Sequence, residues 1–155
     1  MNTVRYFRRK VSRKYGHRFI QGVDFEEIRH PKFKYCMVRD RAIQTRVTGY
    51  HITTQFFILY TDGRLIIHRG YAWDGPSGPT IDTASFMRSS AVHDALFQML
   101  REVLIPARDW RVVFDLANTE LRRLSKIDGM LWPRYHFVKT ALDIAGAKHA
   151  KPRSA

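Results

Sequence analysis

The sequence predicts a single α+β domain, in which an antiparallel sheet comes first and helices follow. Between residues 17 and 73, aromatic and β-branched residues gather in short runs separated by turn signals. From Ser85 onward, apolar residues recur at helical spacing instead. Because strands and helices do not alternate, the pattern favours α+β over a parallel α/β fold. We divide the 155 residues into a basic arm (1–15), one domain (16–147) and a polar tail (148–155).

The basic arm is predicted to be helical. Val4, Phe7 and Val11 fall on one helical face, and Gly16 ends the segment. Such an arm can lie on nucleic acid, on anionic lipid or on a partner protein, or it can pack through its narrow apolar stripe as a solvated helix. The cations that would contact a polyanion or partner are Arg5, Arg8, Arg9, Lys10, Arg13 and Lys14.

The next segments predict an antiparallel meander of four or five strands. The clearest pair surrounds Asp62-Gly63, a dipeptide that supplies the positive φ angles of a two-residue hairpin turn. The last strand leads directly into Asp74. The predicted strands are 18–23, 33–38, 42–47, 52–60 and 65–73.

Three helices are expected after the strands. The first has Ser85 or Ser89 as its N-cap and runs to about residue 102. The second starts at Asp109 and runs to about Ser125, and Asp128-Gly129 stops it. The third runs from about Pro133 to about residue 145, where a glycine follows.

The charge predicts an attraction to polyanions. The chain has 27 Lys and Arg against 14 Asp and Glu, a formal net charge of +13. Nucleic acid, anionic lipid and an acidic protein face are all partners of that kind. A single cysteine, Cys36, excludes an internal disulfide and a cysteine-based zinc site, as expected of a protein in a reducing cytoplasm. The apolar runs are shorter than a membrane span, so we expect neither an integral membrane protein nor a secreted one.

A glycine- and proline-rich loop ahead of the first helix is the candidate site. Its residues 75–79 cannot continue a strand or a helix. Their unpaired carbonyls and amides need a partner. His93 and Asp94 follow on the helix, pointing about 100° apart. One can therefore act as a base while the other holds a cation at the loop, and an oxygen-rich site of this kind suits Ca²⁺.

The second helix offers partners for His93. Asp115 and Asn118 stand three residues apart, and an antiparallel helix could bring either one to the imidazole. An oxygen that accepts from Nδ1 would leave Nε2 as the base for water. The competing interpretation is architectural: His93 bonds a loop carbonyl, and Asp94 holds loop amides.

Several of these runs together resemble an uncharacterised family of phage and prophage proteins, catalogued as a domain of unknown function. The matching runs are GYAWDGPSGPTID, FMRSSAVHDALF and DLANTEL, followed by Tyr135 and Phe137. The resemblance implies a phage-encoded protein that is present in the host cytoplasm during infection or incorporated in the virion.

The loop and helix are also similar to secreted and parvoviral phospholipase A2 domains. That similarity implies an ester hydrolase with His93 as base, oriented by Asp115 or Asn118, and with Ca²⁺ held by the Asp94 carboxylate. Phe97 and Asn118 depart from the pattern, which has a tyrosine and an acid there. The implied backbone ligands of the calcium ion are Trp73, Gly75 and Gly78.

Three functions therefore remain open. The first is a metal-assisted hydrolase with a His-Asp site. The second is a non-enzymatic component of the phage particle, in the capsid, neck or tail, that docks through its basic surface onto phage structural proteins. The third is an accessory nucleic-acid binder, for which charge is the only sequence signal.

Overall fold

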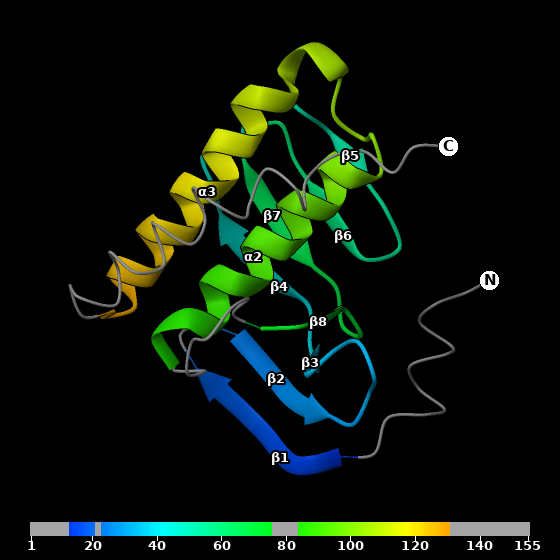
Figure 1. The fold of residues 1–155 in the computed structure, drawn as a ribbon, viewed down its shortest axis with the longest axis vertical. Coiled ribbons are helices and arrows are strands. Elements are labelled where there is room, and N and C mark those ends of the chain that lie inside the picture. The colour runs from blue at the N-terminus through cyan, green and yellow to red at the C-terminus, as the bar shows by residue number, and fades with distance from the viewer. Residues whose placement is uncertain (1–12, 21–22, 76–83, 131–155) are drawn as a thin grey trace.

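The computed structural model describes residues 13–20, 23–75 and 84–130, and within them the α+β class is confirmed. These residues form two four-stranded antiparallel sheets, followed by two long helices. Figure 1 shows the helices side by side, with the strands behind and below them. The predicted third helix at 133–145 and the tail at 148–155 lie outside the described residues.

The first sheet consists of four strands in the order β1-β2-β3-β8. The last pairing joins segments far apart in the chain, with Tyr35 opposite Trp73. The rings of Phe25 and Tyr35 meet edge to face at 5.5 Å. The strands are β1 (Arg13–Ile20), β2 (Val23–Ile28), β3 (Tyr35–Met37) and β8 (Ala72–Trp73).

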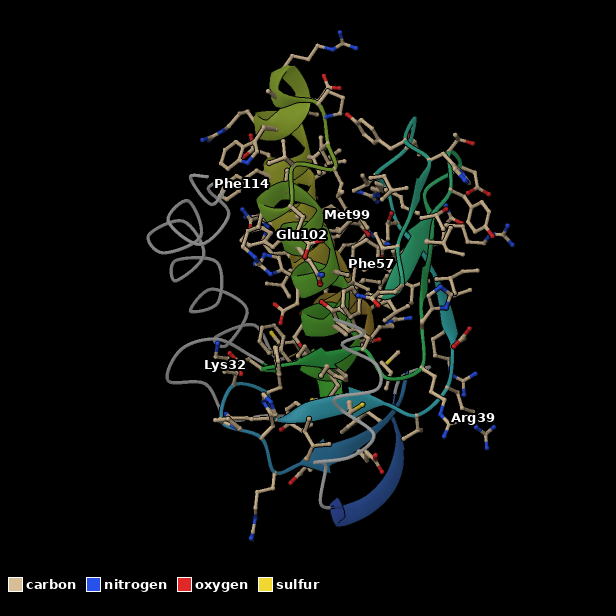
Figure 2. All side chains as sticks on the ribbon, turned by 90° about the vertical axis from the view of Figure 1, so that its right-hand side faces the viewer. Lys32, Arg39, Phe57, Met99, Glu102 and Phe114 are labelled. Atoms are coloured by element: carbon tan, nitrogen blue, oxygen red, sulfur yellow. The ribbon has the colours of Figure 1, made fainter. Side chains whose placement is uncertain are left out.

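The second sheet has the order β4-β7-β6-β5. Its alternate residues, among them Leu65 and Ile67, are buried in the core, as expected for strands with one face covered. Figure 2 shows Phe57 of this sheet and Met99 of the first helix meeting in the core between them. The strands are β4 (Arg41–Gln44), β5 (Ile52–Thr53), β6 (Phe57–Leu59) and β7 (Arg64–Ile67).

The predicted single meander is wrong because two long segments each break into two strands. Within 52–60, the Thr54 hydroxyl accepts the amides of Phe56 and Phe57, which forms a local turn. Within 65–73, the Asp40 carboxylate accepts the Arg69 amide at 2.7 Å and turns the chain. The chain therefore leaves the second sheet after β7 and returns to the first sheet as β8.

The hairpin at Asp62-Gly63 exists, but its turn differs from the predicted one. Gly63 has φ +85°, whereas Asp62 is not among the described residues with positive φ. The Gly63 amide donates to the Tyr60 carbonyl at 2.9 Å. This geometry matches a three-residue loop with a left-handed glycine at its end, the next most common hairpin connection.

The prediction of a helical arm is wrong at the C-terminal end of the arm. Arg13 and Lys14 belong to strand β1, which continues through Gly16 with a shift in register between Arg13 and His17. The strand pairs antiparallel with β2, with Arg13 opposite Ile28 and Ile20 opposite Val23, so long-range pairing overrides the local helical pattern here. Residues 1–12, including the other cations of the arm, lie outside the described residues.

The two helices pack along each other. The α2 helix (Ala84–Arg101) contains Ser85 and Ser89, so neither serine is the predicted cap. Ser89 is buried, and its hydroxyl lies 2.7 Å from that of Ser125. A short 3₁₀ turn (Ala107–Asp109) precedes α3 (Trp110–Ile127), close to the predicted start. Of the described helices, none is long and apolar enough to cross a membrane.

Candidate functional site

His93 is held between the two helices. Its side chain, on α2, is only 10% exposed. Its Nε2 lies 3.0 Å from Oδ1 of Asn118 on α3. An amide oxygen can only accept, so Nε2 carries the proton that it donates. The ring also packs on Phe97, with 3.9 Å between the ring centroids.

This contact reverses the predicted roles of the two ring nitrogens. We expected Nδ1 to be held and Nε2 to serve as the base, and the observed pairing leaves Nδ1 as the nitrogen with a lone pair. The reason is reach: Nε2 is the ring nitrogen farther from the α2 backbone, so it extends to the neighbouring helix. Nδ1 instead lies 4.0 Å from Oδ1 of Asp94, whose side chain is 29% exposed.

Asp115 does not take part in this arrangement. Its carboxylate is 57% exposed and pairs with Arg111 at 3.1 Å along the same helix. Asp115 and Asn118 lie about 60° apart around α3. The buried stripe of α3 includes Asn118 and Phe114 but excludes Asp115. The expectation that either residue could reach His93 is therefore resolved in favour of Asn118.

Hydrogen bonds hold both the side chain and the backbone of Trp73. Its indole Nε1 donates to the Ser90 hydroxyl on α2 at 3.1 Å, and its carbonyl accepts the Lys34 amide at 3.1 Å. The predicted role of its carbonyl as a calcium ligand competes with that hydrogen bond. Gly75 is buried with φ +77°, a conformation that favours glycine. Gly78 lies outside the described residues.

Two carboxylates, Asp74 directly after β8 and Asp94 on α2, interact electrostatically, and we call them the carboxylate pair. Burial raises the pKa of Asp74, and the negative charge of Asp94 raises it further, while Lys34 opposes the shift. Burial raises the pKa of Tyr71 well above its ordinary value, and the charge of Asp94 adds to that effect. Asp94 therefore acts electrostatically, from α2, on Tyr71 and Asp74. Asp74 was not among the predicted site residues, although its position directly after a predicted strand was an available signal.

The carboxylate pair fits Ca²⁺ only in part. Ca²⁺ takes six to eight oxygen ligands. Within the described ranges, no group of three or more His, Cys, Asp or Glu is placed to hold a metal ion. Asp74 and Asp94 supply two carboxylates, and the rest of a calcium shell would have to come from elsewhere. We therefore derive no chemical step through a cation.

Compared with known proteins, the chain matches no family model, no curated protein and no solved structure. The resemblance to phage proteins and to phospholipase A2 domains therefore stays a prediction.

Proposed function

We propose that this chain is a phage-encoded ester hydrolase in which His93 is the general base. One observation carries the proposal: the Nδ1 atom of His93 and the Oδ1 atom of Asp94 are 4.0 Å apart. When Nε2 donates to Asn118, both of these atoms are acceptors. Two acceptors facing each other favour a group that can donate to both, and water is such a group.

The proposed reaction uses that water. Nδ1 takes one proton from the water as its oxygen attacks the ester carbonyl, which gives a tetrahedral intermediate. The imidazolium then returns the proton to the leaving alcohol oxygen, and the products are a carboxylic acid and an alcohol. Asn118 is a positioning residue, because it holds the ring through Nε2 and selects the tautomer. Asp94 would orient the water by accepting a hydrogen bond from it.

Hydrolysis of p-nitrophenyl esters and of phosphatidylcholine vesicles tests the proposal, with and without Ca²⁺. We expect His93→Ala to remove activity and Asp94→Asn to lower kcat by about 10²-fold or more. Asp115→Asn is the matched control, because it neutralises a carboxylate that points away from His93, and it should retain activity. Equal rates for wild type and His93→Ala would overturn the proposal.

Calcium binding is a separate measurement. Isothermal titration of the wild type with Ca²⁺ should give binding that Asp94→Asn and Asp74→Asn weaken and that Asp115→Asn does not. If Ca²⁺ does not bind but esters are still cleaved through His93, the hydrolase stands without the metal. If Ca²⁺ binds and no ester is cleaved, the carboxylate pair is a binding site only.

A second candidate function is favoured by the net charge of +13. We propose, as the alternative, a non-enzymatic component of a phage particle that docks on an acidic face through its basic arm. Deleting residues 2–12 removes most of the arm and leaves strand β1 intact, since β1 begins at Arg13. The alternative expects this deletion to abolish incorporation into particles and His93→Ala to have no effect. Normal incorporation of the deletion variant would exclude it.

A further inference from the structure

The outer face of the second sheet carries side chains that the core does not use. Residues Ile43, Leu59 and Leu65 point into the core, so their neighbours along each strand lie on the opposite face. In Figure 2 the strands of this sheet have α2 on one side, and on the other side they carry side chains that project away from the protein.

One row of polar and aromatic side chains crosses this face. Gln44 stands opposite Arg64 in the strand register. The Arg64 guanidinium lies 4.4 Å from the centroid of the Tyr60 ring. The Tyr60 ring in turn meets the His51 ring edge to face at 5.6 Å. The row therefore places three planar groups next to each other, and it spans three inter-strand spacings, or about 14 Å.

A second, more apolar row lies beside the first. Ile58 is opposite Ile66 in the register, and both isoleucines are half-buried although they point away from the core. The exposed Ala42 and Thr53 flank them on the outer strands. The face thus offers apolar surface directly next to planar and charged groups.

The charge of this part of the chain is positive. Residues 39–69 contain five arginines and two aspartates, with no lysine or glutamate. The carboxylates of both aspartates accept hydrogen bonds from backbone amides in loops. Asp62 accepts from the Arg64 amide at 2.9 Å, and Asp40 accepts from the Arg69 amide. The segment that forms this sheet therefore carries a net positive charge, and Arg64 places one of its cations on the outer face.

We propose that this face of the second sheet binds single-stranded nucleic acid. Unpaired bases stack on aromatic rings and on guanidinium planes, and phosphates are attracted to arginine. The row of Arg64, Tyr60 and His51 supplies both kinds of contact within one site. An acidic protein would use the charge but would not need the rings. The proposal goes beyond ester hydrolysis and does not depend on His93.

Fluorescence anisotropy with a labelled oligothymidine of about 15 nucleotides tests the proposal. We expect Tyr60→Leu to weaken binding roughly five-fold or more, because the stacking surface is lost. Tyr60→Phe keeps the ring and should bind as the wild type does. Arg64→Gln should weaken binding and reduce the slope of log affinity against log salt by about one.

The matched control is Arg108→Gln, which removes the same charge from a side chain that is 85% exposed in the connection between the helices. Its binding should stay within about two-fold of wild type, since it touches no proposed contact. Thermal unfolding of each variant shows whether a loss of binding reflects a loss of fold, and the Arg64 and Arg108 pair tests the site without altering a ring.

Four results with DNA would overturn the proposal. They are an absence of binding by the wild type, unchanged affinity in Tyr60→Leu, equal losses in Arg64→Gln and Arg108→Gln, and equal affinity for duplex DNA of the same length. Binding of polyglutamate with the same dependence on Tyr60 would assign the face to an acidic protein instead, and would overturn it too.

Discussion

Val103 and Gly129 end the two helices in the same left-handed backbone conformation, with φ angles of 56° and 84°. At each end, one amide closes a six-residue turn: Leu104 donates to Met99, and Met130 donates to Ser125, both at 2.9 Å. This is the Schellman motif, in which the left-handed position is normally glycine. A β-branched valine at that position is strained.

Val103→Gly should therefore stabilise the fold by about 1 kcal/mol. The valine side chain is 59% exposed, so little packing is lost. Gly129→Ala is the opposite change and should destabilise the fold by about 1 kcal/mol. The cost is that of placing alanine in a left-handed backbone conformation, because an added Cβ would meet no neighbouring atom. Urea unfolding midpoints measure both changes. A destabilised Val103→Gly would show that the valine makes contacts that outweigh its strain.

Asn118→Leu should destabilise the protein by about 1–3 kcal/mol, because it leaves the buried Nε2–H of His93 without its acceptor. Asp115→Ala, on the same helix, should change stability by no more than about 0.5 kcal/mol, since its ion pair with Arg111 is exposed. Chemical unfolding curves give both values. Equal effects would mean that the contact between His93 and Asn118 contributes nothing to the packing of α2 on α3.

Glu120→Ala should cost about 1.5–3 kcal/mol, the range for losing hydrogen bonds to a charged group. This carboxylate is fully buried, and Arg123 contacts both of its oxygens while also donating to the Gln44 carbonyl at 2.9 Å. Removing the acid leaves Arg123 without its partner beside strand β4. Arg46→Ala is the control: its guanidinium is 4.0 Å from the same carboxylate and its side chain is 64% exposed, so the cost should stay below about 1 kcal/mol. Comparable losses would contradict this ranking.

Gly63→Ala should destabilise more than Gly49→Ala, although the two glycines have nearly the same φ, 85° and 86°. An added Cβ at Gly63 would lie 2.5 Å from the Thr45 carbonyl oxygen, whereas Gly49 has open space. Both changes carry the conformational cost of about 1 kcal/mol, and Gly63 adds an overpacking cost of about 1–3 kcal/mol. Thermal unfolding of the two variants checks the difference, and equal melting temperatures would refute it.

Cys36 should react slowly with thiol reagents in the folded protein. Burial raises its pKa from 9.0 to about 11, and the charge of Glu26 adds to the shift. Because the folded pKa is raised, the protonated thiol contributes stability that is fully present below about pH 9 and is lost as the pH rises through about 11. Reaction with a disulfide reagent at pH 8 should be slow until denaturant is added. Rapid reaction of the native protein would contradict the buried thiol.

Local signals predicted the presence of α2 and α3 and the position of one hairpin. Asp109 stands at the start of α3, and Asp128-Gly129 follows its end, because helix termini depend on residues within one turn. The breaks inside 52–60 and 65–73 were missed for two different reasons. Thr54 forms its turn with neighbouring residues, so its hydroxyl was a local signal. The prediction missed it because it followed the hydrophobic pattern alone. The turn at Arg69 depends on Asp40, which lies 29 residues away in the chain.

The sequence predicted which residues belong to the candidate site, but not how their side chains are arranged. His93, Asp94 and Asn118 were named from their spacing, yet which ring nitrogen faces Asp94 depends on the distance between two helices. Helical spacing allowed both Asp115 and Asn118, and only the position of the buried stripe on α3 excludes Asp115. The electrostatic influence of Asp94 on Asp74 likewise depends on where the tertiary structure places α2 relative to the end of β8.

The sequence by itself determined the α+β class, the positions of α2 and α3 and the positive charge, because these follow from composition and from periodicity within a few turns. The tertiary structure decided the division into two sheets, the return of the chain from β7 to β8 and the orientation of the His93 ring. Those features depend on contacts between residues far apart in the chain, whose energies a local pattern does not contain. The tertiary structure also decided the row on the outer face of the second sheet. Only the strand order brings its four residues together, which are Gln44, Arg64, Tyr60 and His51.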